Sequence, residues 1–109
     1  MKGIKHDKGK VRFDLLPYDA LWEIAEVFTK GAEKYGDRNW ELGIHYERVF
    51  AALMRHLARW WMGEDQDKEF MLHSLAHAGA CVLFLLHYEL NKEIYKEFDN
   101  RPIRRKNGR

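Results

Sequence analysis

Residues 55–77 read RHLARWWMGEDQDKEFMLHSLAH, and the rest of the chain is organised around this stretch. It carries His56, His73 and His77 together with four acidic residues, set between two strongly apolar segments with helical spacing. Two helices joined by an acidic loop can turn such side chains toward one another. Imidazole and carboxylate groups around one cavity can bind a divalent metal ion, which commonly acts on phosphates. The alternative is a helical hairpin with a solvated acidic loop and core histidines.

Helical periodicity continues on both sides of this stretch, and no strand pattern is present. The spacing predicts a first helix over 17–34, a second over 45–62 and a third from Lys68 or Glu69 to at least Tyr88. Beyond Leu90 the chain either continues the third helix or forms a short fourth one. We therefore predict an all-α fold, a small helical bundle of three to four helices.

The third helix is the most apolar part of the chain. Its centre, LAHAGACVLFLL at 75–86, is apolar nearly all round. A single domain of 109 residues offers too little surface to cover such a helix on every side. We therefore expect the bundle to be completed by oligomerisation into a homodimer or tetramer, with residues 69–90 central or at the subunit contact.

Composition favours a cytoplasmic protein. The single cysteine, Cys81, excludes a disulfide framework within one chain and fits a reducing compartment. The first ten residues, MKGIKHDKGK, are charged and unlike a signal peptide. The longest apolar run, 78–86, is too short to span a bilayer, so no membrane association is expected.

Charge divides the chain into three parts. The net charge is only +2, but basic residues concentrate at both ends. Residues 1–16 are predicted to be an irregular basic arm, residues 17–98 the helical domain, and residues 99–109 a loose basic tail. Basic tails sometimes contact polyanions such as nucleic acid. That role would explain the basic ends but not the middle of the chain, so nucleic acid is not the expected partner.

Arginine and tryptophan side chains in the helical domain are candidate ligand contacts. Arg48, Arg55 and Arg59 lie along one strip of the second predicted helix, where guanidinium groups can pair with acids or bind phosphate. Trp40 lies in a polar loop and is costly to expose. It either covers the core or stacks on a base and closes a pocket.

Four segments, in order and spacing, resemble one family. HDKGKVRFDLLP, GAEKYGDRNW, RHLARWWMGEDQDKE and LAHA are similar to the small phage and prophage dATP/dGTP diphosphohydrolases, which are related to the MazG-like all-α nucleotide pyrophosphohydrolases. The resemblance covers about residues 6–90. It implies that residues 17–98 form a nucleotide-binding domain and that the protein is a hydrolase. The reaction would cleave a purine (deoxy)nucleoside triphosphate to the monophosphate and pyrophosphate.

The resemblance also implies site residues. The first motif is matched by Glu33, Lys34, Tyr35, Asp37, Asn39 and Trp40, the second by His56, Glu64 and Asp67, and the third by Glu69 and His77. In the third motif this chain departs from the family pattern. Phe70 and Met71 replace a Ser-Gly pair, and Ser74 stands where a histidine is expected. These departures bear on catalysis more than on nucleotide binding.

Carried over to this chain, these matches give each residue an expected role. The expected catalytic residues are Glu33, Glu64 and Asp67, and the expected metal ligands are His56, Glu64, Asp67 and His77. The expected nucleotide-binding residues are Lys10, Arg12, Lys34, Tyr35, Asp37, Asn39, Trp40, Arg55 and Trp60. A Mg, Mn or Co ion would offset phosphate charge and activate water. Loop carboxylates such as Glu64 and Asp67 should contribute little to stability if they are exposed.

A second interpretation stays open from the residues alone. A MazG-like scaffold without one metal ligand could bind a nucleotide and not cleave it. Such a protein would sequester a nucleotide, including a signalling nucleotide in phage counter-defence. Both interpretations share the nucleotide partner and the all-α scaffold, and turnover separates them.

Overall fold

The computed structural model describes residues 1–103, and this part of the chain contains helices and no β-strand. In chain order the elements are η1 (Phe13–Leu15), α1 (Tyr18–Tyr35), η2 (Asn39–Leu42), α2 (Tyr46–Trp61), α3 (Ser74–Leu90), α4 (Lys92–Tyr95) and η3 (Lys96–Phe98), where η marks a 3-10 helix. The predicted all-α fold is confirmed. The last part of the predicted basic tail, 104–109, lies outside the described residues.

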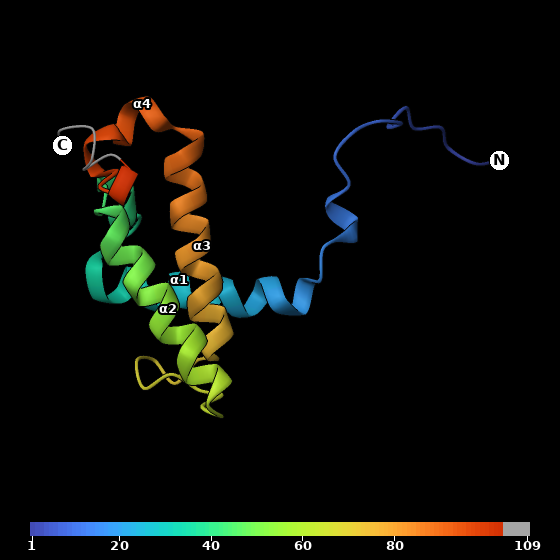
Figure 1. Cartoon of the computed structure of the whole chain (residues 1–109). Coiled ribbons are helices and arrows are strands. Elements are labelled where there is room, and N and C mark those ends of the chain that lie inside the picture. Colours follow the sequence, from blue (N-terminus) through green and yellow to red (C-terminus); the bar gives the residue numbers. More distant parts are fainter. Residues whose placement is uncertain (104–109) are drawn as a thin grey trace.

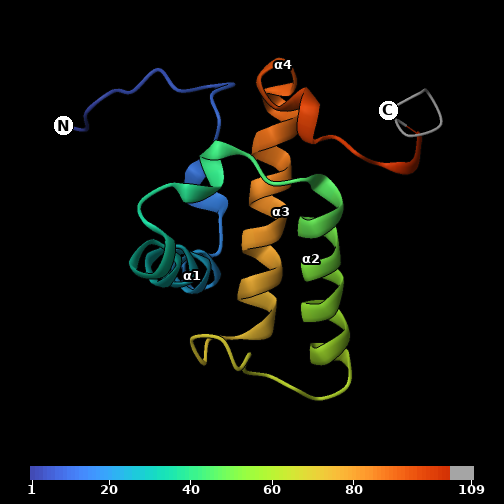
Figure 2. The same ribbon diagram turned by 90° about the vertical axis from the view of Figure 1, so that its left-hand side faces the viewer.

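The helices pack as a hairpin crossed by a third helix. α2 and α3 run antiparallel side by side, and α1 crosses α3 at a steep angle, in the half of the hairpin nearer the loop that joins α2 and α3 (Figures 1 and 2). The core between α2, α3 and α4 is formed by Tyr46, Val49, Cys81, Tyr88 and Tyr95. A smaller core between α1 and α3 is formed by Val27, Ala76 and Ala80. Small residues on α3 therefore allow α1 to approach closely.

The first two helices begin and end within one residue of their predicted limits. Pro17 is the N-cap of α1, where its missing N–H costs nothing. α1 stops at Gly36, whose φ of 94° suits glycine far better than other residues. α2 stops before Gly63, whose φ is 101°. Local chain stereochemistry alone accounts for these limits.

The third helix begins later than predicted. It starts at Ser74, whereas the sequence placed its start near Lys68 or Glu69. Phe70 and Met71 have positive φ values of 68° and 57°, which a helix cannot include. The Asp67 N–H donates to the Leu72 carbonyl across the loop at 2.8 Å. The residues between α2 and α3, hereafter the 62–73 loop, therefore close on themselves instead of extending α3.

The first residues of the predicted tail, 99–101, contact the helical domain. Asn100 Oδ1 accepts a hydrogen bond from the Glu47 N–H at the start of α2, at 3.0 Å. Asp99 is buried, and its Oδ2 lies 2.7 Å from the Arg101 guanidinium. Phe98 packs so closely on Gly43 that a Cβ at Gly43 would overlap its ring. The packed part of the chain therefore continues past Phe98, the last residue of the predicted helical domain.

The irregular arm, residues 1–16, projects from the start of α1 away from the other helices (Figure 1). Its recorded hydrogen bonds reach no further than Tyr18, whose hydroxyl donates to the Phe13 carbonyl at 2.8 Å. The projecting arm contributes to a radius of gyration of 17.3 Å, compared with about 13 Å for a compact chain of this length. No helix among residues 1–103 has the length and apolarity needed to cross a membrane.

Candidate functional site

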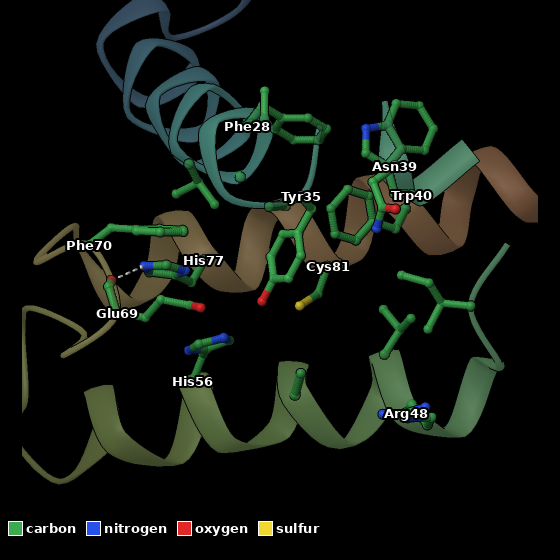
Figure 3. Close-up of a pocket in the computed structure, with 18 of the residues that line it drawn as sticks. Phe28, Tyr35, Asn39, Trp40, Arg48, His56, Glu69, Phe70, His77 and Cys81 are labelled. Atoms are coloured by element: carbon green, nitrogen blue, oxygen red, sulfur yellow. Dashed lines mark hydrogen bonds between the residues drawn. The ribbon is translucent and has the colours of Figure 1, made fainter. Parts of the chain in front are cut away.

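A cavity of about 510 Å³ lies between α1, α2, α3 and the 62–73 loop. Figure 3 shows α1 on one side of it and α2 on the other, with α3 behind. Its volume falls in the range typical of small-molecule sites, roughly 300–1,000 Å³. We call it the central cavity, and its walls combine aromatic rings, arginines and a histidine pair.

An aromatic cluster forms the wall near η2. The Trp40 ring stacks on Phe84 with centroids 5.6 Å apart, and Phe28 meets both rings edge-on at 6.0 and 5.3 Å. The Trp40 main-chain oxygen accepts a hydrogen bond from the Tyr88 hydroxyl at 2.7 Å. Trp40 therefore covers the core and lines the cavity at the same time, so the two interpretations of this residue are compatible.

Two arginines on α2 face the central cavity without a carboxylate partner. Arg48 and Arg55 lie seven residues apart, which is two helical turns, and both line the wall. Among residues 1–103 neither guanidinium has a recorded ion pair. Arg59, the third member of the predicted strip, lies 3.6 Å from Asp67 instead. The first two arginines are therefore free to bind an anion.

Tyr35 and Asn39 line the mouth of the central cavity where α1 ends. Tyr35 is 57% exposed, and Figure 3 shows its hydroxyl directed into the cavity. Lys34 beside it points to the loop, with Nζ 2.8 Å from Glu69 Oε2. That hydrogen bond raises the pKa of Lys34 above its ordinary value. Lys34 is thus committed to an ion pair, whereas Tyr35 is available to a ligand.

Asp67, on the 62–73 loop, binds His56 of α2. Asp67 is only 3% exposed, and its Oδ2 accepts a hydrogen bond from His56 Nδ1 at 2.7 Å. Its Oδ1 accepts from the Glu69 N–H at 2.9 Å. Burial alone would raise the Asp67 pKa, but these two hydrogen bonds and the nearby histidines shift it below its ordinary value. Asp67 is therefore a buried carboxylate with both oxygens engaged.

His77, on α3, forms a stack with two other rings. The His56 and His77 centroids lie 4.9 Å apart with planes inclined by 21°, and Phe70 covers the other face of His77 at 5.8 Å. His77 Nε2 donates to the Glu69 main-chain oxygen at 3.0 Å (Figure 3). Burial lowers the pKa of His77, so the imidazole is neutral at pH 7.

The expected acidic ligands do not converge on the central cavity. Glu33 is exposed on α1, 3.6 Å from Lys30, and does not line the cavity. Glu64 does not line it either, and its main-chain oxygen accepts from the Ser74 hydroxyl at 3.0 Å. Within residues 1–103, no group of three or more His, Cys, Asp or Glu side chains could hold a metal ion. The group of metal ligands expected from the sequence is therefore not assembled within this part of the chain.

The structure brings together part of the predicted site. Of the predicted residues, the central cavity is lined by Tyr35, Asn39, Trp40, Arg55, His56 and His77. Those outside its wall are Lys10, Arg12, Glu33, Lys34, Asp37, Trp60, Glu64 and Asp67. Lys10 and Arg12 lie on the projecting arm, and Trp60 is exposed beside Trp61.

Sequence reasoning missed several wall residues. Phe28 and Phe70 were not predicted as ligand contacts, and Arg48 was placed only on a strip of arginines. Helical spacing could have found two of them, since Phe28 lies two turns before Tyr35 and Arg48 lies two turns before Arg55. The position of Phe70 depends on the left-handed backbone of the 62–73 loop, which no local pattern indicates.

Comparisons with known proteins agree on one family. The family model described as "dATP/dGTP diphosphohydrolase, N-terminal" matches residues 1–101. A protein named dATP/dGTP diphosphohydrolase, from Salmonella phage PMBT28, is 38% identical over 85 residues, which are 78% of this chain and 29% of that relative. The chain thus spans less than a third of the length of that protein. No solved structure matches.

Proposed function

The chain belongs to the dATP/dGTP diphosphohydrolase family, and on that premise we propose that its central cavity binds a purine deoxynucleoside triphosphate. We further propose that the protein cleaves this nucleotide to the monophosphate and pyrophosphate. The observation that carries the binding proposal is the pair Arg48 and Arg55, which face the cavity opposite aromatic side chains and have no recorded ion pair within residues 1–103.

The cavity wall contains side chains suited to both parts of a nucleotide, the phosphates and the purine base. Guanidinium groups bind phosphate oxygens through paired charge-assisted hydrogen bonds, which suits Arg48 and Arg55. A purine is a flat aromatic surface, and the exposed face of Tyr35 offers a ring of the same kind at the cavity mouth. Asn39 supplies an amide that can donate and accept hydrogen bonds beside it.

A divalent ion, Mg, Mn or Co, is part of the proposal because phosphoryl chemistry on a triphosphate usually requires one. When bound, such an ion would offset phosphate charge and lower the pKa of water. Among residues 1–103, Glu69 is the carboxylate that lines the cavity.

We also propose that the protein is a homo-oligomer, a dimer or tetramer. The α2–α3 hairpin exposes large apolar side chains that recur at helical spacing on each helix, which we call the hairpin back: Phe50, Met54, Trp61, Leu75, Val82 and Leu86. A second copy of the same surface would cover it with matching chemistry.

A second candidate function is supported by a specific observation. Asp67 is buried with both oxygens engaged, and Glu64 lies outside the cavity wall, so two expected metal ligands do not face the ligand. A protein that sequesters a nucleotide, as in phage counter-defence, needs the arginines and the aromatic wall but no metal ligands. It would bind the same triphosphate and release it unchanged.

The two functions are separated by one experiment. The protein is incubated with dATP, dGTP, dCTP or dTTP in the presence of Mg²⁺, Mn²⁺ or Co²⁺, and the products are resolved by anion-exchange chromatography. Release of dAMP or dGMP with pyrophosphate supports hydrolysis. Tight binding of dATP by calorimetry without any product supports sequestration.

Variants of the arginines test the cavity itself. Arg48→Ala and Arg55→Ala should each weaken dATP binding about tenfold or more, since a hydrogen bond to a charged group contributes about 1.5–3 kcal/mol. Lys92→Ala removes an exposed cation on α4, outside the cavity wall, and should leave the affinity unchanged. Unchanged affinity in both arginine variants would place the nucleotide elsewhere.

A further inference from the structure

His56 and His77 use different ring nitrogens in their hydrogen bonds, Nδ1 in His56 and Nε2 in His77. Asp67 and the Glu69 carbonyl can only accept, so the proton lies on His56 Nδ1 and on His77 Nε2. In the neutral rings the remaining nitrogens, His56 Nε2 and His77 Nδ1, are then acceptors with a free lone pair.

Both free nitrogens keep contact with the central cavity. Every buried side-chain nitrogen or oxygen in the described residues has a hydrogen-bond partner. No partner is recorded for His56 Nε2 or His77 Nδ1, so each must retain some accessible surface. Both residues line the central cavity, which is where that surface lies.

The ring geometry is unsuited to joint metal binding. Imidazole lone pairs lie in the ring plane, and a ligated ion lies about 2.0–2.1 Å from the nitrogen along that direction. The two planes are inclined by only 21°, with centroids 4.9 Å apart. The two lone pairs therefore lie in nearly parallel, stacked planes, which disfavours their convergence on one ion. Phe70, stacked on the far face of His77, and Asp67, bound to His56, resist rotation of either ring.

We infer that His56 and His77 are a pair of hydrogen-bond acceptors for an N–H or O–H group of the bound ligand, and that Asp67 is a positioning residue that sets the His56 tautomer. The inference rests on the proposed nucleotide function for the identity of the ligand. A deoxypurine nucleotide carries such donors on its exocyclic amine and on its 3′-hydroxyl. Anionic phosphate oxygens offer only lone pairs, so this end of the cavity disfavours them.

The role of Asp67 follows from its two hydrogen bonds. Its Oδ1 accepts from the Glu69 N–H and its Oδ2 from His56. In Asp67→Asn the amide oxygen would keep the Glu69 contact, which places the amide NH₂ against His56. An NH₂ group donates, so the His56 proton should move to Nε2, and the acceptor facing the cavity would become a donor.

The test is long-range ¹H–¹⁵N correlation of the imidazoles in the metal-free protein at neutral to mildly alkaline pH. We expect His56 with its proton on Nδ1, His77 with its proton on Nε2, and inversion of the His56 tautomer alone in Asp67→Asn. Asp65→Asn, an exposed acid of the same loop outside the cavity wall, is the matched control and should change neither ring. A wild-type His56 protonated on Nε2 would overturn the inference, and that measurement needs no variant to fold.

Titration of the wild-type protein with Zn²⁺ tests joint metal binding. We expect that one equivalent of Zn²⁺ will not shift the ¹⁵N resonances of His56 Nε2 and His77 Nδ1 together. A joint shift of both resonances at one equivalent would show chelation and overturn the acceptor role.

Nucleotide analogues identify the donor that the histidines accept. Calorimetry compares dATP with the triphosphate of purine 2′-deoxyriboside, which has no amine, and with dideoxyATP, which has no 3′-hydroxyl. We expect about tenfold weaker binding for one of them, and loss of that difference in Asp67→Asn but not in Asp65→Asn. Equal affinities for all three would contradict the acceptor role. Failure of dATP itself to bind would instead contradict the proposed function, and the tautomers would still decide the role of Asp67.

Discussion

Lys34 Nζ lies 2.8 Å from Glu69 Oε2 and so ties the end of α1 to the 62–73 loop. The same loop residue accepts the His77 Nε2 hydrogen bond through its main-chain oxygen. A lysine predicted to bind nucleotide and an acid of the third motif are therefore joined to each other. Together they fix one rim of the central cavity, whose wall includes Glu69 and Phe70.

Removing this ion pair should loosen the loop. In Glu69→Gln the carboxylate that holds Lys34 is lost, so amide hydrogens in the 62–73 loop should exchange faster, as measured by hydrogen exchange with mass spectrometry. Glu93→Gln is the control, because it breaks an exposed pair with Lys96 inside one short segment. Equal exchange in the loop of both variants would mean that the Lys34–Glu69 pair does not restrain it.

Asp67 and Glu64 should differ sharply in their effect on stability. The sequence placed both on a loop where carboxylates contribute little, but Asp67 is buried and bonded to His56 and Glu69. Asp67→Ala should lower the free energy of unfolding by about 2–4 kcal/mol, because it leaves those donors unpaired. Glu64→Ala should change it by less than about 0.5 kcal/mol. Urea unfolding followed by circular dichroism gives both values.

Two glycines in helices should respond in opposite directions to alanine. Nothing lies within 4 Å of a Cβ at Gly31 on α1, so Gly31→Ala should stabilise the protein by about 0.5–1 kcal/mol. A Cβ at Gly79 on α3 would lie 2.7 Å from Ile24 Cδ1, so Gly79→Ala should destabilise it by about 1–3 kcal/mol. Ile24→Val should recover part of that loss. Thermal melting of the set measures how closely α1 approaches α3.

Cys81 should react slowly despite lining the central cavity. Burial raises the pKa of its thiol to about 11, so at pH 8 the thiolate fraction is on the order of a hundredfold below that of a free cysteine. The iodoacetamide rate, followed by mass spectrometry, should be at least about tenfold below that of glutathione at pH 8. It should keep rising beyond pH 9 in the folded protein, and dATP should slow it further. A rate equal to that of glutathione at pH 8 would contradict burial of the thiol.

The raised Cys81 pKa also predicts how stability depends on pH. The folded-state pKa lies above that of an unperturbed thiol, so this thiol favours folding at lower pH. That contribution should be lost as the pH rises from about 9 to 11. The free energy of unfolding should therefore fall less steeply over this range in Cys81→Ala than in the wild type.

The hairpin back should determine the oligomeric state. Val82→Glu and Leu86→Glu each place a charge among exposed apolar side chains of α3, so light scattering should show a shift from oligomer toward monomer. Val11→Glu makes the same change at an exposed apolar residue of the arm and should leave the mass unchanged. A monomeric wild type at micromolar concentration would remove the basis of this proposal.

The sequence by itself determined the helices and one side of the central cavity. Apolar residues at helical spacing, Pro17 before α1 and glycines after the helices are local signals, and α1 and α2 follow them to within one residue. Helical geometry likewise places Arg48 and Arg55 on one face of α2. These features need no knowledge of which segments meet in space.

The tertiary structure decided what the acidic loop does. Four acids between two helices resemble a metal site, yet their direction depends on the left-handed backbone at Phe70 and Met71 and on the contact between Asp67 and His56. Asp67 and His56 are eleven positions apart, and because α2 ends at Trp61 no continuous helix relates them. A buried carboxylate needs hydrogen-bond donors. Asp67 finds one in its own loop, the Glu69 N–H, and the other in His56 of α2, which only the packing of the loop against α2 brings within reach.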